Sequence, residues 1–444
     1  MRNQRPLRVL LFSFLTIGLA TSASAQETWT LRDCIDYALQ HNIQIQTKEI
    51  THATNEASLE QARAAQRPTL NFSGSFGANF QNVTTYNDYM EKNSGFAATN
   101  NYGLNSGLTL YQGGRLRNTV KQQSLQTEAS GYDVEQQRID IEISIAQAYI
   151  QLLYDKESID IKHKTAELSE HQVKRGEELH RAGSISKVEL AQLRSQHASD
   201  LYQIVVAENT FETDRLKLKQ LLELGLEDDF EPAFPEISDA LVGTPLPDLA
   251  DIYAEALATL PSMRSAALGV DASELAVKVA KGSFAPSINL SAGISTGWNS
   301  ATGTTYFDQL GNKLGESLGL NLSVPIFNGK QVRTSVKRAE LQYEAQQLQF
   351  ESSKKQLLAT LESLRNDAVS AQERYFASQE QLKAAEESLT LVSEQFDAGI
   401  KNTVELLTEK NNYVSALSQQ LQAKYQAVLA AKVLGRYMEQ PIDL

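Results

Sequence analysis

The sequence predicts a mixed α/β fold, in which four strands contribute to a membrane β-barrel shared between chains and very long coiled-coil helices continue it. Three observations support this prediction. The 444-residue chain contains an internal twofold repeat. Each repeat has two segments in which apolar and polar residues alternate, which is typical of strands. Each repeat also has a proline-free stretch long enough for a helix of roughly 70 residues.

Residues 1–25 are expected to be a cleaved secretory signal peptide. Arg2, Arg5 and Arg8 precede a short apolar core, and Ala23-Ser24-Ala25 has the small residues of a cleavage site. The alternative is a transmembrane anchor, but the apolar run of about 12 residues is shorter than the roughly 20 that a spanning helix needs. Beyond residue 25 no apolar stretch reaches that length, so a membrane role would require β-strands or partners.

Charge and cysteine content narrow the function classes. The chain has 41 Lys and Arg against 54 Asp and Glu, and the signal peptide holds three of the basic residues and no acid. This acidic balance argues against nucleic acid as a partner, and its simplest role is to keep a long polar surface soluble. Cys34 is the only cysteine, which excludes an intrachain disulfide. We expect it to be a core thiol in a helix.

The two repeats match at a spacing of about 216–218 residues. Pro68-Thr-Leu-Asn-Phe-Ser73 corresponds to Pro286-Ser-Ile-Asn-Leu-Ser291, and Ala182-Gly183 corresponds to Ala398-Gly399. Between the repeats lies a segment with four prolines among acidic residues, which is the composition of a linker. The predicted division is a first repeat at 26–224, an inter-repeat linker at 225–248 and a second repeat at 249–444.

Two strand pairs are predicted, at 69–82 with 101–112 and at 287–299 with 316–327. In each strand, apolar residues alternate with Asn, Ser, Thr and Gly, so each pair has one apolar face and one polar, nearly uncharged face. A length of about ten residues also fits a tilted transmembrane strand. The apolar residues that we expect to face lipid are Leu70, Phe72, Phe76, Leu104, Leu108, Leu110, Ile288, Leu290, Ile294, Leu320, Leu322 and Val324.

Such strands could belong to a soluble sandwich or to a membrane barrel. The small, neutral residues of the polar face suit the lining of a wet lumen, which favours the barrel. Four strands cannot close a barrel, because the smallest stable ones have about eight, and an open sheet edge in lipid leaves backbone groups unsatisfied. Two copies would give about eight strands and three about twelve, and a water-filled lumen favours three.

Two helices of roughly 70 residues are predicted at 115–182 and 331–398. At about 1.5 Å per residue each would be roughly 100 Å long, which is too long for a compact globule. Apolar residues recur at spacings of three and four, as in Leu357, Leu361 and Leu364, which indicates that the helices pack on one another as coiled coils.

Each long helix is expected to end in a tight turn that reverses the chain. Gly183 and Gly399 follow the two helices, and glycine is common just past a helix C-terminus because it accepts a left-handed backbone. Ser186 and Thr403 can cap the helices that return. Each repeat would thus end in a helical hairpin whose tip lies far from the strands.

The sequence lacks the motifs of an enzyme. No two of its six histidines have the spacing of four that places two metal ligands on one helix face. A phosphate-binding glycine loop followed by Lys and Ser or Thr is absent, as is a Gly-x-Ser-x-Gly elbow. We therefore expect no catalytic residue, no bound metal and no cofactor.

The chain beyond residue 25 resembles the TolC-like outer-membrane efflux proteins. The resemblance rests on the order and duplication of Leu108-Thr-Leu-Tyr-Gln-Gly-Gly114, Ser323-Val-Pro-Ile-Phe-Asn-Gly329 and the paired hairpin turns. It implies a homotrimer with one twelve-stranded barrel in outer-membrane lipid and a helical tunnel through the periplasm. It also implies a passive channel whose tips dock a periplasmic adaptor protein, which in turn joins an inner-membrane pump of the RND, ABC or MFS type.

The same resemblance implies gate residues at the tips. Glu405 matches an acid that forms a ring at the constriction, while the position of a second ring acid is Thr408. Glu189 matches an acid that latches the closed tip, and Lys401 and Phe396 stand where the family has Arg and Tyr as its partners. Because Lys lacks the planar fork of Arg and Phe lacks a hydroxyl, a weaker latch is expected. The alternative for Glu405 is an ordinary first-turn acid stabilised by the helix dipole.

Residues around the two turns are candidates for contacts with the adaptor, although Val188 and Val404 could equally pack the hairpins together. An alternative function for the chain is a periplasmic adaptor or a coiled-coil scaffold protein of an export complex. An adaptor, however, would carry one hairpin between compact β-domains. The candidate adaptor contacts are Arg181, Gly183, Ser184, Ile185, Val188, Leu190, Gly399, Ile400, Val404 and Leu406.

Overall fold

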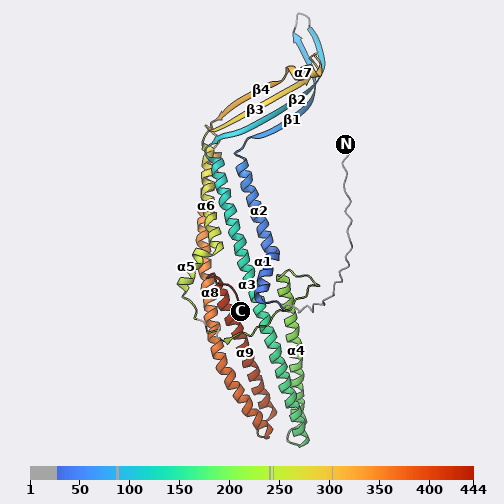
Figure 1. The fold of residues 1–444 in the computed structure, drawn as a ribbon, viewed down its shortest axis with the longest axis vertical. Helices are drawn as coiled ribbons and strands as arrows, with labels where there is room; N and C mark the ends of the chain where they lie inside the picture. Colours follow the sequence, from blue (N-terminus) through green and yellow to red (C-terminus); the bar gives the residue numbers. More distant parts are fainter. Residues whose placement is uncertain (1–27, 87–89, 240–241, 244, 303) are drawn as a thin grey trace, which may run out of the picture.

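The computed structural model describes residues 28–86, 90–239, 242–243, 245–302 and 304–444. The molecule is elongated, with a four-stranded sheet at one end and two helical hairpins at the other (Figure 1). The predicted mixed α/β class is therefore confirmed. The expected signal peptide lies outside the described residues. Among the helices that are described, none combines the length and the apolar character needed to cross a membrane.

The first half of the chain supplies the blue to green elements of Figure 1. Asn42 separates its first two helices: the side chain caps the second, and Nδ2 donates to the carbonyl oxygen of Leu221 at 3.1 Å. The elements in order are α1 (Leu31–His41), α2 (Ile43–Ala64), β1 (Thr69–Tyr86), β2 (Met90–Gln112), α3 (Arg115–Arg181) and α4 (Lys187–Leu221).

The second half supplies the yellow to red elements. Both predicted long helices are confirmed, since α3 and α8 each contain 67 residues. The elements in order are α5 (Leu249–Thr259), α6 (Pro261–Lys281), the short 3₁₀ helix η2 (Gly282–Phe284), β3 (Ser287–Asn299), α7 (Tyr306–Asn312), β4 (Gly315–Ser323), α8 (Gln331–Asp397) and α9 (Thr403–Arg436).

Several predicted boundaries differ from the structure. The first hairpin continues through most of the segment expected to be a loop, because the Thr, Asn and Ser residues there tolerate extended backbone. The second loop contains α7, whose N-cap Thr305 accepts from the backbone N–H of Asp308 at 3.3 Å. β4 ends at Ser323 because Pro325 lacks the N–H that a strand ladder uses. Val324, expected to be a lipid-facing strand residue, therefore lies beyond the strand.

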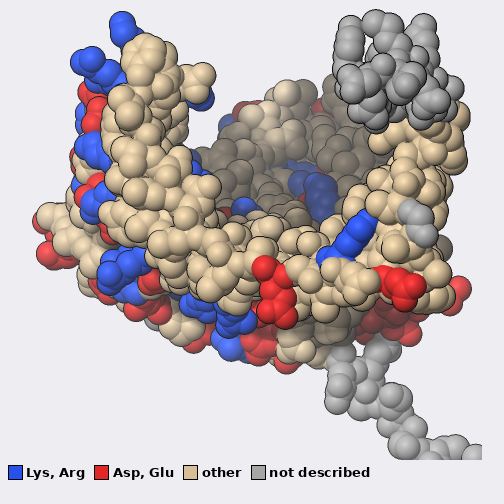
Figure 2. Space-filling model, turned by 90° about the horizontal axis from the view of Figure 1, so that it is seen from above, with Lys and Arg blue, Asp and Glu red and all other residues tan. Residues whose placement is uncertain are grey.

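The sheet has the order β1-β2-β3-β4, with every pair antiparallel. Its register aligns apolar residues across the strands, as in the row Leu108–Leu290–Leu320, while the row Phe72–Leu104–Ile294 ends at Glu316 on β4. The neighbouring row on the opposite face is polar and neutral: Asn71, Asn105, Gly293 and Ser317. The predicted separation into an apolar face and a polar face is thus confirmed. Seen from above, the molecule curves around a hollow (Figure 2).

A β-bulge interrupts the alternation at the end of β2. The pairing with β3 shifts between Thr109 and Tyr111, so that Tyr111 lies opposite Ile288 and Leu110 has no residue directly across from it. A bulge places two residues of one strand against one of its partner and increases the local twist. Leu110 therefore does not belong to the regular apolar row in which the sequence placed it.

Below the sheet, the helices form a wall held by apolar clusters. The largest joins α1, α3 and α9, and Cys34 is fully buried in it, as predicted for a core thiol. The predicted inter-repeat linker at 225–248 packs against the helices, since Phe230 and Ile237 belong to this cluster. The hydroxyl of Tyr149 on α3 donates to the carbonyl oxygen of Ala233 at 2.5 Å and fixes the segment further.

Candidate functional site at the hairpin tips

Both hairpin turns are closed by hydrogen bonds within the turn itself. Gly183 and Gly399 have positive φ, as predicted. At the first tip, Ser186 and Glu189 form a capping box: the Ser186 N–H donates to Glu189 Oε2 at 2.7 Å, and the Glu189 N–H donates to Ser186 Oγ at 3.2 Å. Each box satisfies N–H groups that have no partner inside the helix. The sequence signal was Ser followed by Glu three residues later.

The second tip uses a different cap from the one predicted. Asn402 caps α9 and forms the capping box with Glu405, with donor–acceptor distances of 3.1 and 3.0 Å. Thr403, predicted to be the cap, is the first residue of the helix and is fully buried. Its Oγ1 has no hydrogen-bond partner among the described residues. The one-residue shift arises because Asn is at least as good an N-cap as Thr.

The four predicted gate residues do not form one cluster within the chain. Glu189 binds its own N-cap, while Lys401 Nζ donates to Glu405 Oε1 at 2.6 Å. The ammonium group of Lys401, with the Asn402 N–H, lowers the pKa of Glu405. Phe396 is buried in an apolar cluster that also contains Leu406. The Glu189–Lys401 pairing anticipated for the latch is therefore replaced, within one protomer, by local partners for both side chains.

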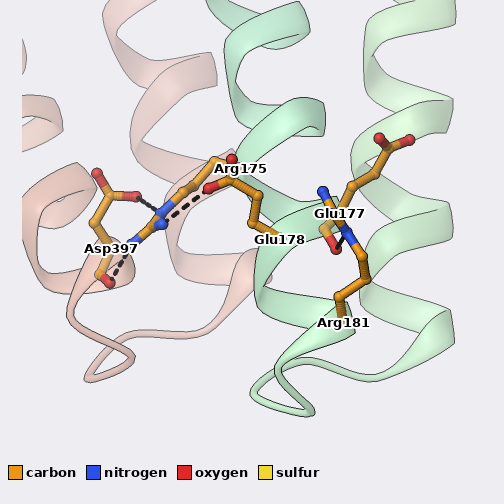
Figure 3. Close-up of polar contacts among 5 residues, drawn as sticks. All are labelled: Arg175, Glu177, Glu178, Arg181 and Asp397. Atoms are coloured by element: carbon orange, nitrogen blue, oxygen red, sulfur yellow. Dashed lines mark hydrogen bonds and ion pairs between the residues drawn. The ribbon is translucent and has the colours of Figure 1, made fainter.

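Arg175, which the sequence analysis did not identify, makes a polar contact between the two tips. An apolar cluster that contains Leu179 and Phe396 also joins the hairpins there. The Nε of Arg175 donates to Asp397 Oδ1 at 3.1 Å and its NH2 donates to the Asp397 carbonyl oxygen at 3.0 Å. Its NH1 donates to Glu178 Oε2 at 3.2 Å on the same helix. Figure 3 shows the guanidinium between the α3–α4 hairpin in green and the end of α8 in pink. These two carboxylates raise the pKa of Arg175.

The repeat shows a charge difference at the turns but does not identify this contact. The residue before the Ala-Gly turn is Arg181 in the first half and Asp397 in the second, so the matched positions carry opposite charges. Arg181 does not take part in the bridge: its Nε donates to the backbone oxygen of Glu177 within α3, as Figure 3 shows. Arg175, the partner of Asp397, lies six residues before Arg181 in α3, a position that only the crossing of the hairpins defines.

A buried ion pair connects the hairpins further from the tips. Lys410 on α9 donates to Asp200 on α4, and the side chain of Lys410 is completely buried. Gln196 Nε2 also donates to Asp200 at 2.9 Å. Burial lowers the pKa of Lys410, while the contact with Asp200 opposes that change. The two hairpins thus share an exposed contact at the tips and a buried contact above them.

The predicted adaptor contacts divide by exposure. Val188, Ile400 and Val404 are exposed, although packing was an open explanation for the two valines. Leu190 and Leu406 are buried inside the hairpins, which corrects their assignment as surface contacts. Hairpin packing requires the apolar positions that face the partner helix, and these two residues occupy them. Gly183, Ser184 and Gly399 are exposed, and Ile185 is half-buried.

The comparison with protein families places the chain in a class. The family model of outer membrane efflux proteins matches residues 34–223 and 252–438, which is most of the chain. The chain therefore belongs to the outer membrane efflux protein family. Membership in this family makes it an outer-membrane efflux-family protein and not an enzyme. This assignment favours the channel over the alternative of an adaptor or scaffold protein.

Two relatives carry functional names. The chain is 28% identical over 222 residues to the pyoverdine export outer membrane protein OpmQ of Pseudomonas aeruginosa, which covers 49% of this chain and 44% of that protein. It is 26% identical over 242 residues to the fusaric acid resistance protein FusA of Burkholderia cepacia, which covers 54% of this chain and 44% of that protein. The chain thus spans less than half the length of these relatives in the matched regions.

Solved structures share the fold. The match to CusC has a TM-score of 0.81 at 19% identity and covers 92% of this chain and 91% of that chain. The match to the open state of the MtrE outer membrane channel of Neisseria gonorrhoeae has a TM-score of 0.74 at 19% identity, with 92% and 88% covered. The match to the outer membrane protein VceC of Vibrio cholerae has a TM-score of 0.77 at 17% identity and covers 92% of this chain and 95% of VceC.

Proposed function

We propose that this chain is the passive exit channel of a tripartite export system, and that three copies close a twelve-stranded barrel above a common helical tunnel. The observation that carries the proposal is the two-faced sheet with open edges. Within the described residues, β1 and β4 each pair with a strand on one side only. The apolar face is exposed in a single protomer, with Phe72, Phe76 and Leu320 all open to solvent. Lipid and neighbouring copies would cover these surfaces.

The tunnel would open to the periplasm at the hairpin tips. There, the exposed Val188, Ile400 and Val404, together with the turn residues around Ser184, offer an apolar rim for a periplasmic adaptor. The adaptor would connect the channel to an inner-membrane pump of the RND, ABC or MFS type, which would supply the energy. The names of the relatives, pyoverdine export and fusaric acid resistance, favour small organic molecules as cargo.

The Arg175–Asp397 bridge would hold the closed state. It crosses from one hairpin to the other, so an outward movement of either hairpin must break two hydrogen bonds. Both side chains are about half exposed, so solvent screening keeps such a pair weak. Three Arg175–Asp397 bridges, one in each copy of the proposed trimer, would favour the closed tips and still allow them to open. Lys401 would reduce the negative charge of a Glu405 ring, so any cation attraction there would be smaller than that of three free carboxylates.

Conductance in planar bilayers tests this proposal. The purified protein should form channels, and Arg175→Gln should increase the mean conductance or the open fraction, because the bridge between the hairpins is lost. Arg194→Gln is the matched control, since Arg194 pairs with Glu177 inside the first hairpin at 2.7 Å. The control should behave as wild type. Absence of conductance in both the wild type and Arg175→Gln would contradict the channel, and equal effects of the two variants would contradict the gate.

A further inference from the structure

The charge of the chain is distributed unevenly where the sheet meets the helices. Four junction segments, at 61–69, 113–127, 275–287 and 324–339, contain eleven Lys or Arg and no Asp or Glu. The chain as a whole has a formal net charge of −13, so this concentration of basic residues runs against its overall balance. All eleven side chains are exposed. We call these four segments the junction collar.

The four segments lie at one end of the helical wall. Figure 1 shows the top of α2, α3, α6 and α8 meeting below the sheet. Gly113, after β2, lies so close to η2 that a Cβ atom there would clash with the carbonyl oxygen of Gly282. Lys281 at the end of α6 pairs with Glu340 on α8 at 3.2 Å. The collar is therefore a spatial feature and not only a count along the sequence.

Most of the collar cations have no acidic partner. Lys278 pairs with Glu274 and Lys281 with Glu340. The other nine basic side chains make no ion pair with any residue that the structure describes. Elsewhere on the helices, several exposed basic residues are paired within a turn, as Lys174 is with Glu170, and acidic residues are interspersed among the unpaired ones. A group of like charges without counterions repels itself, so it gains free energy when an anionic surface approaches.

The collar also carries exposed apolar side chains. Ile326 and Phe327, between β4 and α8, are 93% and 87% exposed, and Phe284 and Tyr111 are about half exposed. Exposed apolar and aromatic groups, followed along the chain by basic groups, are the pattern of a protein at the boundary between acyl chains and headgroups. The apolar sheet face ends at this level, so the collar would lie against the leaflet that faces the periplasm.

We propose that the junction collar binds the phosphate-bearing headgroups of anionic phospholipids in the periplasmic leaflet of the outer membrane. The proposal rests on the location of the sheet in that membrane. Basic residues near an anionic membrane surface each contribute roughly a fivefold gain in affinity, and the effect falls with salt. Blue side chains also lie inside the hollow (Figure 2), so the test must separate a lipid from an anion in the hollow.

Thermal unfolding of the assembled protein in neutral detergent provides the test. Short-chain phosphatidylglycerol should raise the melting temperature more than phosphatidylcholine of the same chain length, and 0.5 M salt should abolish the difference. Glycerol 3-phosphate, the free headgroup, should have little effect, because many cations act together only on a surface. Equal shifts with the two lipids, a salt-independent difference, or an equal shift with glycerol 3-phosphate would each overturn the proposal.

A pair of matched variants assigns the effect to the collar. The collar variant is Arg115→Gln, Lys121→Gln, Arg333→Gln and Lys337→Gln, and the control is Lys156→Gln, Lys164→Gln, Arg374→Gln and Lys383→Gln. Both remove four exposed cations from α3 and α8, and the control positions lie about 50 Å or more further along the helices. The collar variant should lose most of the phosphatidylglycerol effect and the control should keep it.

The outcomes separate this proposal from the channel function. An equal loss of the phosphatidylglycerol effect in both variants would overturn the proposal that the collar binds lipid. So would a collar variant that changes the anion selectivity in bilayers but not the response to lipid. If the collar variant does not assemble, the salt and headgroup comparisons on the wild type still decide. A wild type that needs no detergent and forms no oligomer would contradict the channel itself. An intact oligomer that does not distinguish the lipids would contradict the collar alone.

Discussion

Asp155 lies in the helical wall between α3 and α4, and its side chain is almost completely buried. Gln151 Nε2 donates to its Oδ1 at 2.9 Å, and Oδ2 has no donor among the described residues. It faces Asp214, which pairs with Lys217 at 2.6 Å. Burial, and then the contact with Asp214, raises the pKa of Asp155 to about 7. A proton shared by the two carboxyl groups would supply the missing donor.

This environment predicts a pH-dependent stability. Between about pH 4 and pH 7 the folded state keeps a proton on Asp155 that the unfolded state releases, so the stability contributed by this group falls as the pH rises through that range. Asp155→Asn is neutral at every pH. It should stabilise the protein by about 2–4 kcal/mol at pH 8, since one pKa unit corresponds to about 1.4 kcal/mol. The gain should disappear near pH 4, as measured by thermal unfolding.

The exposed Asp160 on the same helix is the control. Asp160→Asn removes a carboxylate without removing a buried one, so the pH profile of unfolding should match that of the wild type. A profile for Asp155→Asn that runs parallel to the wild type at all pH values would show that Asp155 does not hold the proton.

At the same scale, the sequence identified some site residues better than others. Glu189 and Glu405 were singled out as gate acids, with a first-turn acid as the alternative for Glu405, and both serve in capping boxes. That role depends on residues three positions apart, which a sequence displays directly. Arg175 and Asp397 are 222 residues apart, and their contact depends on how two hairpins cross. No local pattern contains that geometry.

Among the elements, α4 and α9 are joined by the fully buried ammonium of Lys410 and the carboxylate of Asp200. Lys410→Met should destabilise the protein by about 3–5 kcal/mol, because it leaves an uncompensated buried charge on Asp200. Asp200→Asn combined with Lys410→Met removes both charges and keeps an acceptor for Gln196. The double variant should recover most of the loss in thermal denaturation followed by circular dichroism. If the single and double variants have the same melting temperature, the uncompensated charge on Asp200 is not the cause of the destabilisation.

The sequence predicted the long elements more accurately than the short ones. α3 and α8 were predicted within a residue of their ends, because no proline interrupts them and a glycine turn ends each one. α7 has only seven residues, too few for a helical period to be recognised, and it was missed. The first hairpin was longer than expected, because neutral polar residues do not distinguish a strand from a loop.

For the whole molecule, the two faces of the sheet predict different responses to the same substitution. Leu320 and Asn321 are neighbours in β4, so their side chains lie on opposite faces. Leu320→Arg would place a charge on the lipid face and should cost about 2–4 kcal/mol per protomer near the membrane midplane. It should reduce the heat-resistant oligomer on gels and the amount in the outer-membrane fraction. Asn321→Arg should leave both unchanged and shift the ion selectivity toward anions.

The opposite result would contradict the barrel. If Leu320→Arg assembled normally while Asn321→Arg did not, the apolar face would have to be the inner one, as in a packed soluble sandwich. The alternation of apolar and polar residues can be predicted from the sequence. The closure of a barrel cannot, because it depends on contacts between copies of the chain.

The self-contained turns at the tips have a mechanical consequence. Each turn is closed by bonds among residues that are neighbours in the chain, and none of those bonds involves the other hairpin. In the proposed channel, opening at the tips would therefore tilt each hairpin as a rigid unit, with its turn undeformed. Resistance to this movement would come from the contacts between the two hairpins. The buried Lys410–Asp200 pair would be the point about which the tips rotate.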